Sequence, residues 1–320
     1  MTLASILARN GHAVRLLCRT IDEARAINET RRTPRAASFD LPADIVATSY
    51  TRAALDRIEA LIIAVPSQSV RENARRIAAS LAPGTLLVHA TKGLEHGTAK
   101  RVSEMLLEEV PQLAPGDVCA LSGPNLAAEI QRRLPAATVI AGSDAANVER
   151  AQRLFHGGAF RVYASSDLAG VELAGSLKNV VALAAGIADG FSLSDNAKAG
   201  IITRGLAEIT RLGVAEGADP MTFAGLAGIG DTMATCYSPL SRNRRTGEAI
   251  ARGASVADAI AAAGGVVEGV EATAAACVLA TRHGIEMPIA AGLRAVLFDG
   301  AAPMEAIRRL LEREATREGV

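Results

Sequence analysis

The chain has 320 residues, of which 49% are hydrophobic and 21% are charged, and its formal net charge is zero. The neutral total argues against a nucleic-acid partner or an anionic membrane surface. Four widely spaced cysteines without a CxxC pair or metal spacing predict buried thiols in a reducing compartment, with no metal site. No charge-free run of about 18 apolar residues and no signal-peptide pattern is present, so we expect a cytoplasmic protein without a membrane span.

The first half of the chain alternates between helical and strand patterns. Residues 2–10 predict a helix, residues 12–20 a buried strand, residues 21–31 a helix and residues 31–44 a loop. Continuous apolar runs predict further strands at 45–48, 61–65, 86–90, 118–122, 137–141 and 160–164. This alternation is typical of a parallel sheet with both faces covered by helices. We therefore predict an α/β fold, with a Rossmann-type doubly wound domain over residues 1–165.

The second half contains no strand pattern. Helical periodicity is found at 167–188, 195–213, 219–227, 245–263, 271–283 and 303–316. We therefore predict an all-helical domain over residues 166–320.

The first predicted domain lacks the opening strand and glycine-rich turn of a dinucleotide-binding unit. That strand lies in the middle of such a sheet, and its loss leaves strand edges unpaired in the core, at roughly 1–3 kcal/mol for each unsatisfied group. We expect the natural protein to carry a strand and a turn before Met1. The alternative, that the printed chain is the native form, stays open.

Lys178 lies within an apolar helical stretch, GVELAGSLKNVVALAAGIADG. A helix that is hydrophobic all round is buried, and a buried ammonium group must be paired or must have a lowered pKa. Both conditions suit a lysine that transfers a proton. The alternative is a packed lysine stem whose charged tip reaches solvent.

Two motifs follow predicted strands, at the sheet edge where ligands bind in this fold class. In ATKGLE, Lys92 is placed to reach an anion, unless it is an ordinary surface lysine. In LSGPN, Gly123 makes a turn before a helix whose free N–H groups suit an anion, and Asn125 is alternatively a simple helix cap.

Two motifs of the helical half carry further polar groups. In GIGDTMATCYSPLSRNRR, Asp231 is placed to orient a buried ammonium, and the run from Ser241 to Arg245 offers donors that suit phosphate oxygens. A solvated basic face is the alternative for this run. In VVEGVE, Glu268 could form a hydrogen bond to a ribose or an amide group of a ligand. The alternative is that Glu268 is an ordinary helix cap.

Together these residues resemble the bacterial-type NAD(P)-dependent sn-glycerol-3-phosphate dehydrogenase family. The resemblance runs from Leu3 to the last helix, through ATKGLE, LSGPN, the Lys178 stretch, NAKAGIITRGLAE, GLAGIGD and SRNRRTGEA in the family's order. It implies reversible hydride transfer between NADP or NAD and dihydroxyacetone phosphate, giving sn-glycerol 3-phosphate for glycerophospholipid synthesis. It also makes a homodimer plausible.

The resemblance implies a role for each matching residue. Lys178 is the acid/base group and Asp231 holds it in place. The substrate-binding residues implied are Lys92, Gly123, Asn125, Lys178, Asp231, Ser241, Arg242 and Asn243. The cofactor-binding residues implied are Lys92, Ala127, Arg242, Val266 and Glu268.

Three positions qualify the resemblance. Arg19 follows a predicted strand at the ribose position, where an arginine accepts the 2′-phosphate of NADP, although the nearby Asp22 leaves NAD possible. Asn125 stands where the family usually has a hydroxyl residue, and an amide still donates and accepts hydrogen bonds. The pyrophosphate-binding glycines have no counterpart here. A related dehydrogenase of another small oxo or hydroxy acid, and a non-catalytic remnant, are the remaining hypotheses.

Overall fold

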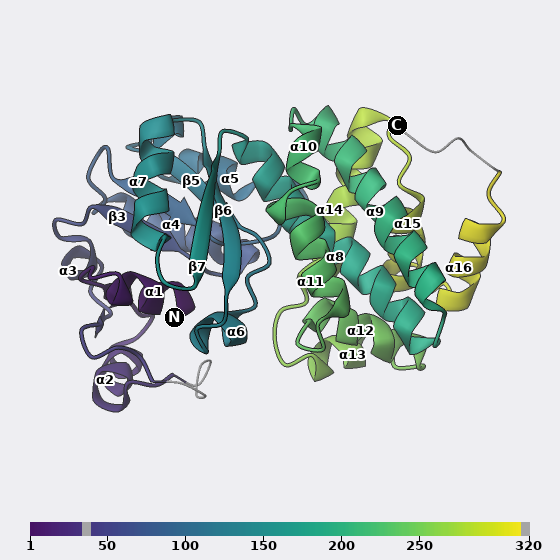
Figure 1. Cartoon of the computed structure of the whole chain (residues 1–320), viewed down its shortest axis with the longest axis horizontal. Coiled ribbons are helices and arrows are strands. Elements are labelled where there is room, and N and C mark those ends of the chain that lie inside the picture. The colour runs from purple at the N-terminus through teal and green to yellow at the C-terminus, as the bar shows by residue number, and fades with distance from the viewer. Residues whose placement is uncertain (34–39, 315–320) are drawn as a thin grey trace.

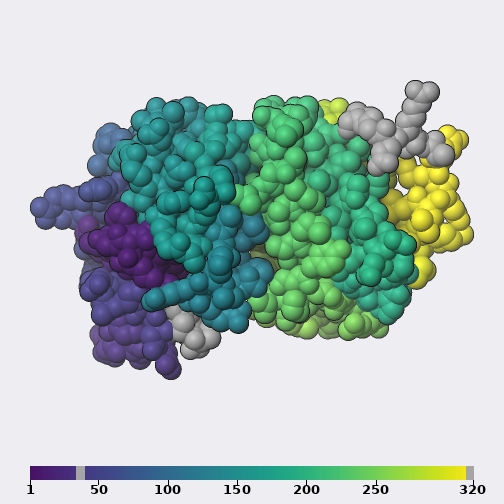
Figure 2. Space-filling model, in the orientation of Figure 1, coloured from purple at the N-terminus to yellow at the C-terminus, as the bar shows by residue number. Residues whose placement is uncertain are grey.

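The structure is a computed structural model that describes residues 1–33 and 40–314. It has two lobes (Figure 1): a sheet-containing lobe, drawn purple to teal, and a helical lobe, drawn green to yellow. The space-filling view shows the lobes in contact along the boundary between teal and green (Figure 2). The site described below is built from residues of both lobes.

The chain begins with a helix and a small two-stranded sheet. Helix α1 (Thr2–Arg9) leads into β1 (Arg15–Leu17), α2 (Ile21–Thr30) and β2 (Val46–Thr48), and β1 pairs with β2 in parallel. The side chain of Thr20 caps α2 by accepting a hydrogen bond from Glu23 N. Arg76 connects this sheet to the rest of the lobe, because it donates to the carbonyls of Cys18 and Ser49.

The main sheet has five strands in the order β3-β4-β5-β6-β7. Its strands are β3 (Ala60–Ile63), β4 (Leu86–His89), β5 (Val118–Ser122), β6 (Ala136–Gly142) and β7 (Phe160–Ser165). Among the described residues, no strand of this sheet pairs with the two-stranded one.

Helices cover both faces of the main sheet. The neighbouring β4 residues Leu87 and Val88 face opposite cores, because side chains alternate along a strand. Leu87 packs with α4 (Val70–Ala78) and α5 (Val102–Glu109), and Val88 packs with α1 and α7 (Ala145–Phe155). The short α3 (Thr51–Leu55) contributes Leu55 to the first of these cores. The predicted α/β fold with a helix-covered, mainly parallel sheet is confirmed.

The last two strands, β6 and β7, run against the direction expected for a wholly parallel sheet. Strand β6 pairs antiparallel with β5, so that Ser122 lies opposite Val139, and β7 then pairs parallel with β6. The connection from β5 to β6 contains only the five-residue α6 (Ala127–Gln131) and does not return to the opposite edge. The chain therefore enters β6 at the edge where it leaves β5.

The helical lobe is arranged around α8 (Leu168–Gly190), of which 19 residues are buried. Contacts from α9, α11, α12 and α14 surround it, and β5 touches it from the sheet side. By length and composition α8 could cross a membrane, but 94% of its most apolar window is buried in the protein, as in a core helix. The other elements are α9 (Asp195–Ala215), α10 (Pro220–Phe223), a π-helical turn (Leu226–Gly230), α11 (Asp231–Tyr237), α12 (Arg242–Ala251), α13 (Val256–Ala262), α14 (Glu268–His283), α15 (Pro288–Phe298) and α16 (Pro303–Leu311).

Helices α8 and α12 approach each other through glycines. A Cβ atom added to Gly186 would lie 2.1 Å from the carbonyl oxygen of Arg244, and one added to Gly247 would lie 2.3 Å from that of Leu183. Only glycine permits this separation of the two backbones. The close approach brings the start of α12 to the middle of α8.

Several predicted boundaries are wrong. The helix predicted over 245–263 is two helices, because Gly253 between them has a φ of +96°, which ends α12. Helix α15 was not predicted at all. The strand predicted over 12–20 is regular only over Arg15–Leu17. The helix predicted over 303–316 ends at Leu311, and residues 315–316 lie outside the described residues.

Candidate active site

Lys178 lies in the middle of α8 with a side chain only 7% exposed. Its ammonium group donates to Asp231 Oδ1 at 2.6 Å and to Thr235 Oγ1. Asp231 and Thr235 share one face of α11, because residues four apart in a helix are neighbours. The alternative of a lysine tip in solvent is therefore excluded, and the charge is buried and paired.

Burial lowers the pKa of Lys178 to about 8, because the charged form is penalised away from water. The negative charge and the hydrogen bond of Asp231 oppose this shift, and the positive charge of Lys92 adds to it. An amine with a pKa close to the working pH both gives and takes a proton readily.

Lys92 brings a second ammonium group to the same carboxylate from the other lobe. It follows β4, and its Nζ donates to Asp231 Oδ2 and, at 3.2 Å, to the carbonyl oxygen of Gly123. Gly123 has a φ of +147°, and a Cβ there would lie 3.0 Å from Thr138 Cα. Asp231 thus joins two lysines, and the peptide at Gly123 lies beside them.

Asn125 carries a buried acceptor without a partner. Its Nδ2 donates to Thr138 Oγ1 at 2.8 Å, and that hydroxyl donates to the carbonyl oxygen of Ser122. No hydrogen bond in the described part of the chain reaches Asn125 Oδ1. A buried acceptor of this kind is normally satisfied by a ligand or water. Nearby, Ala127 is exposed at the first turn of α6.

Asn179 and Asn243 connect α8, α12 and α14. Asn243 Nδ2 donates to Asn179 Oδ1 at 2.8 Å, and its Oδ1 accepts from Gly269 N at 2.9 Å. Asn179 in turn donates to Glu268 Oε2 at 3.2 Å. Burial raises the pKa of Glu268, although the charges of Lys92, Lys178 and Arg242 oppose the shift.

The start of α12 places the predicted phosphate-binding residues. The side chain of Ser241 caps the helix by accepting from Arg244 N. Arg242 is exposed, and its guanidinium group lies beside Gly265, the residue before the exposed Val266. The guanidinium group of Arg244 is less available for a phosphate, because its Nε donates a hydrogen bond to Asp189 Oδ2 at 2.6 Å.

Arg19 lies apart from this cluster, just after the carboxyl end of β1. Its side chain is 71% exposed, and its nearest acidic partner is Glu23, at 3.9 Å. The structure brings Lys92, Gly123, Lys178 and Asp231 together at the boundary between the lobes, and leaves Arg19 at the far strand.

The residues at the lobe boundary fit the nicotinamide end of a dinucleotide. They offer cationic donors in Lys92 and Arg242 and an unpartnered acceptor in Asn125. Amide, ribose and phosphate groups require such a mixture of donors and acceptors. Within residues 1–33 and 40–314, no group of three or more His, Cys, Asp or Glu side chains could hold a metal ion.

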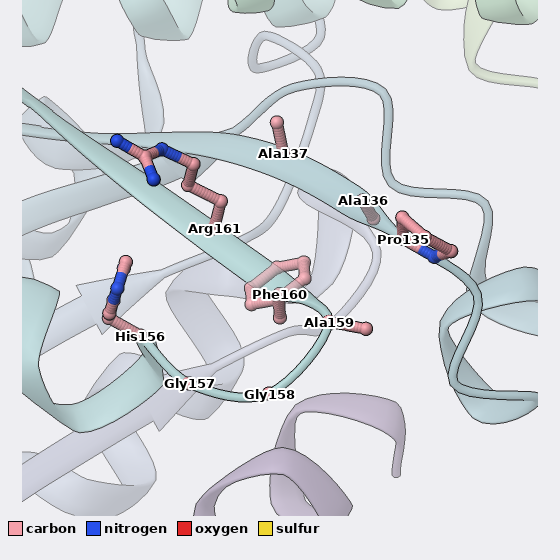
Figure 3. A pocket seen from close by; sticks show the side chains of 9 residues that line it. All are labelled: Pro135, Ala136, Ala137, His156, Gly157, Gly158, Ala159, Phe160 and Arg161. Carbon is pink, nitrogen blue, oxygen red and sulfur yellow. The ribbon is translucent and has the colours of Figure 1, made fainter.

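A separate open pocket of about 580 Å³ lies at the start of β6 and β7 (Figure 3). Small residues, among them Ala137, Gly157 and Gly158, form most of its lining, together with His156, Phe160 and Arg161. None of the predicted site residues lines it. The candidate active site is therefore the lobe boundary around Lys178.

The sheet lobe supplies a lysine and a turn at one edge of a helix-covered sheet. The helical lobe supplies a buried lysine–aspartate pair. Together they define a nucleotide-dependent dehydrogenase with two lobes. Comparison with known proteins identifies the group within this class. Residues 1–148 match the model of the NAD-dependent glycerol-3-phosphate dehydrogenase N-terminus, and residues 167–308 match that of its C-terminus. The chain belongs to the NAD-dependent glycerol-3-phosphate dehydrogenase family.

Individual relatives agree with this membership. The chain is 43% identical to glycerol-3-phosphate dehydrogenase [NAD(P)+] of Dehalococcoides mccartyi, over 99% of this chain and 89% of that protein. It is 45% identical to the enzyme of the same name from Geobacillus thermodenitrificans, over 99% and 92%. The crystal structure of glycerol-3-phosphate dehydrogenase from Coxiella burnetii superimposes with a TM-score of 0.91 at 35% identity, over 98% and 95%.

Sequence reasoning missed several residues that the structure places around the site. Thr235 contacts Lys178, and its spacing of four from Asp231 is a helical signal that pointed to it. Thr138 supports Asn125 from β6, and no local pattern indicates that contact. Glu172 and Ser176 lie on the same helix as Lys178 and are considered below.

Proposed function

We propose that this chain catalyses reversible hydride transfer between NADP or NAD and a small phosphorylated ketone, dihydroxyacetone phosphate, to give sn-glycerol 3-phosphate for glycerophospholipid synthesis. The observation that carries the proposal is the shared carboxylate of Asp231, which holds Lys178 from one lobe and Lys92 from the other. Family membership and the names of its relatives support this choice of substrate.

The proposed role of Lys178 is proton transfer. When bound, the reduced nicotinamide supplies a hydride to the carbonyl carbon of the substrate. The carbonyl oxygen then gains negative charge, and the Lys178 ammonium gives it a proton, which leaves a neutral amine. Asp231 orients the ammonium and compensates its charge. In the reverse direction the neutral amine takes the proton from the alcohol.

The remaining predicted residues position the two reactants. Ser241, Arg242 and Asn243 lie at the start of α12, where the helix N-terminus and the guanidinium group favour a phosphate. Lys92, Gly123 and Asn125 approach the substrate from the sheet lobe.

At the cofactor side, we assign Ala127, Val266 and Glu268 to the nicotinamide half, with Lys92 and Arg242 reaching both ligands. The exposed guanidinium of Arg19 favours the 2′-phosphate of NADP over the free hydroxyl of NAD.

Replacement of Lys178 tests the proposal. Lys178→Ala removes the proton donor, and we expect turnover of dihydroxyacetone phosphate with NADPH to fall by about 10²–10⁴-fold while the protein stays folded. Initial rates measure the loss, and circular dichroism with thermal unfolding checks the fold. Arg294→Ala, which removes another cation of the helical lobe from an exposed ion pair with Asp299, is the control and keeps full activity. Retained turnover in Lys178→Ala would refute the assignment, and faster turnover of a non-phosphorylated keto acid by the native chain would refute the substrate.

We also propose that residues 1–165 and 166–320 are two structural domains, and that the protein works in the cytoplasm.

We further propose that the protein forms a homodimer through the helical lobe. Apolar side chains exposed on that lobe, including Tyr237 and Leu240, support an interface between copies. Sedimentation equilibrium is expected to give twice the chain mass of 33.0 kDa, and a single-chain mass at all concentrations would contradict the dimer.

A further inference from the structure

The segment that carries Lys92 has no regular structure of its own. Residues 90–101 connect β4 to α5 without a helix or strand. Backbone hydrogen bonds of regular elements therefore do not fix the position of Lys92. Side chains from neighbouring elements must do so, and those on α8 are of most interest because α8 also carries Lys178.

Ser176 holds the inner end of this segment. Its hydroxyl is buried, accepts a hydrogen bond from Gly93 N at 2.9 Å and donates to the carbonyl oxygen of Glu172 at 2.7 Å. Gly93 directly follows Lys92, and Ser176 comes two residues before Lys178. One hydrogen bond thus connects the backbone beside one lysine to the helical turn beside the other.

Glu172 holds the outer end. Its buried carboxylate accepts from Ser103 N at 2.8 Å and from Ser103 Oγ at 2.6 Å, where α5 begins. Arg101 Nη1 lies 3.2 Å from one of its oxygens, and the buried His89 Nε2 lies 3.1 Å from the other. The residues on both flanks of the segment, His89 on β4 and Arg101 to Ser103, therefore meet a single side chain of α8.

The α8 backbone between these two anchors packs closely against the sheet lobe at Gly175. A Cβ atom added to Gly175 would lie 2.4 Å from Ser122 Oγ and 4.0 Å from Lys92 Cγ. The stem of Lys92 therefore passes close to the α8 backbone. Farther along the segment, Gln68 holds the backbone at Leu94 and His96 independently of α8.

We propose that Glu172 and Ser176 are positioning residues that fix the distance between Lys92 and Lys178 by fastening residues 90–103 to α8. The inference rests on the function proposed above for the two lysines. Neither Glu172 nor Ser176 touches the reacting atoms, and both act through the segment that carries Lys92. Removal of the Glu172 or Ser176 side chain leaves both lysines in the protein, but the distance between their ammonium groups is no longer fixed.

The pH profile of ketone reduction distinguishes this role from a general loss of stability. The charged groups that act on Lys178 are Asp231, Lys92 and Glu268, and the positive charge of Lys92 lowers the pKa of Lys178. When Lys92 is less firmly held, that pKa rises. We expect the high-pH limb of kcat/KM in Ser176→Ala to move up by about half a pH unit, as one weakened like-charge interaction would produce.

The rates give a second measure. In Ser176→Ala the amide of Gly93 loses its acceptor, and we expect kcat/KM for dihydroxyacetone phosphate to fall on the order of tenfold. Glu172→Gln keeps the shape of the side chain and removes its charge. We expect this variant also to lower kcat/KM and to move the high-pH limb of kcat/KM to higher pH.

Glu208→Gln is the matched control. Glu208 is another buried carboxylate of the helical lobe that accepts hydrogen bonds at a helix start, from Ile289 N at 2.9 Å and Ala290 N at 3.3 Å. Within the described residues, its carboxylate forms no hydrogen bond with a proposed site residue. We expect this variant to change the melting temperature and to leave the pH limb unmoved.

The outcomes are separable. A limb that moves in Ser176→Ala and Glu172→Gln, but not in Glu208→Gln, supports the inference. An unmoved limb in the first two variants, with Lys178→Ala inactive, overturns it and leaves the proposed function intact. Turnover in Lys178→Ala overturns the lysine assignment itself, and this inference with it.

Discussion

At the scale of single residues, the decisive group is the ammonium of Lys178. Burial brings its pKa to about 8, and reduction of a ketone needs the protonated form. We expect kcat/KM for reduction to fall as the pH rises through about 8. Oxidation of the alcohol needs the neutral amine, so its rate is expected to rise through the same pH. Initial rates in both directions measure the two limbs.

Asp231→Asn supplies the control for this titration. The carboxylate raises the pKa of Lys178, so its loss is expected to move the reduction limb to lower pH. Limbs of the same sign in both reaction directions would show that a group other than Lys178 titrates.

At the scale of elements, the close crossing of α8 and α12 places the start of α12, which carries the residues proposed to bind phosphate. Gly247→Ala places a methyl group 2.3 Å from a backbone oxygen of α8, which cannot rotate away. We expect the free energy of unfolding to fall by about 1–3 kcal/mol, the usual result of overpacking. Chemical denaturation measures the change.

Gly200→Ala is the corresponding control on α9. Apart from the neighbouring backbone of α9, no atom of the described residues lies within 4 Å of a Cβ there, so the substitution is expected to be neutral or to stabilise the helix by up to about 1 kcal/mol. Equal losses from the two substitutions would contradict the close approach of α8 and α12.

The elements also show how far the sequence determined the site. Lys178, Asp231 and Lys92 were predicted because each has an informative neighbourhood: an apolar helix, a glycine-rich turn and a strand end. Glu172 and Thr138 were not, because their partners His89, Arg101 and Asn125 come from other elements, and local periodicity contains no information on such pairing. The direction of β6 was missed for the same reason, since a strand has the same pattern in either direction. The residues 288–298, PIAAGLRAVLF, were not predicted as a helix although Pro288 stands at a favourable first position.

At the scale of the whole molecule, the site unites the lobes. Lys92 and Gly123 come from the sheet lobe, and Lys178 and Asp231 from the helical lobe, so a ligand bound as proposed would contact both lobes. We expect sn-glycerol 3-phosphate with NADP, at about 100 times their dissociation constants, to raise the free energy of unfolding by about 2.7 kcal/mol for each ligand. Differential scanning calorimetry is expected to show that the whole chain unfolds at a higher temperature. Glycerol, which lacks the phosphate, is the control, and a shift confined to one of two separate transitions would contradict a shared site.

The burial of α8 also has a consequence for the synthesis of the chain. Helix α8 leaves the ribosome about 50 residues before α12, the helix that crosses it most closely. At the usual rate of translation this interval lasts roughly 3 to 10 seconds. During that time the nascent chain exposes an apolar helix of membrane-spanning length, without its final covering. The helix that buries Lys178 in the finished protein is thus uncovered while the protein is made, and we expect it to need a chaperone during that time.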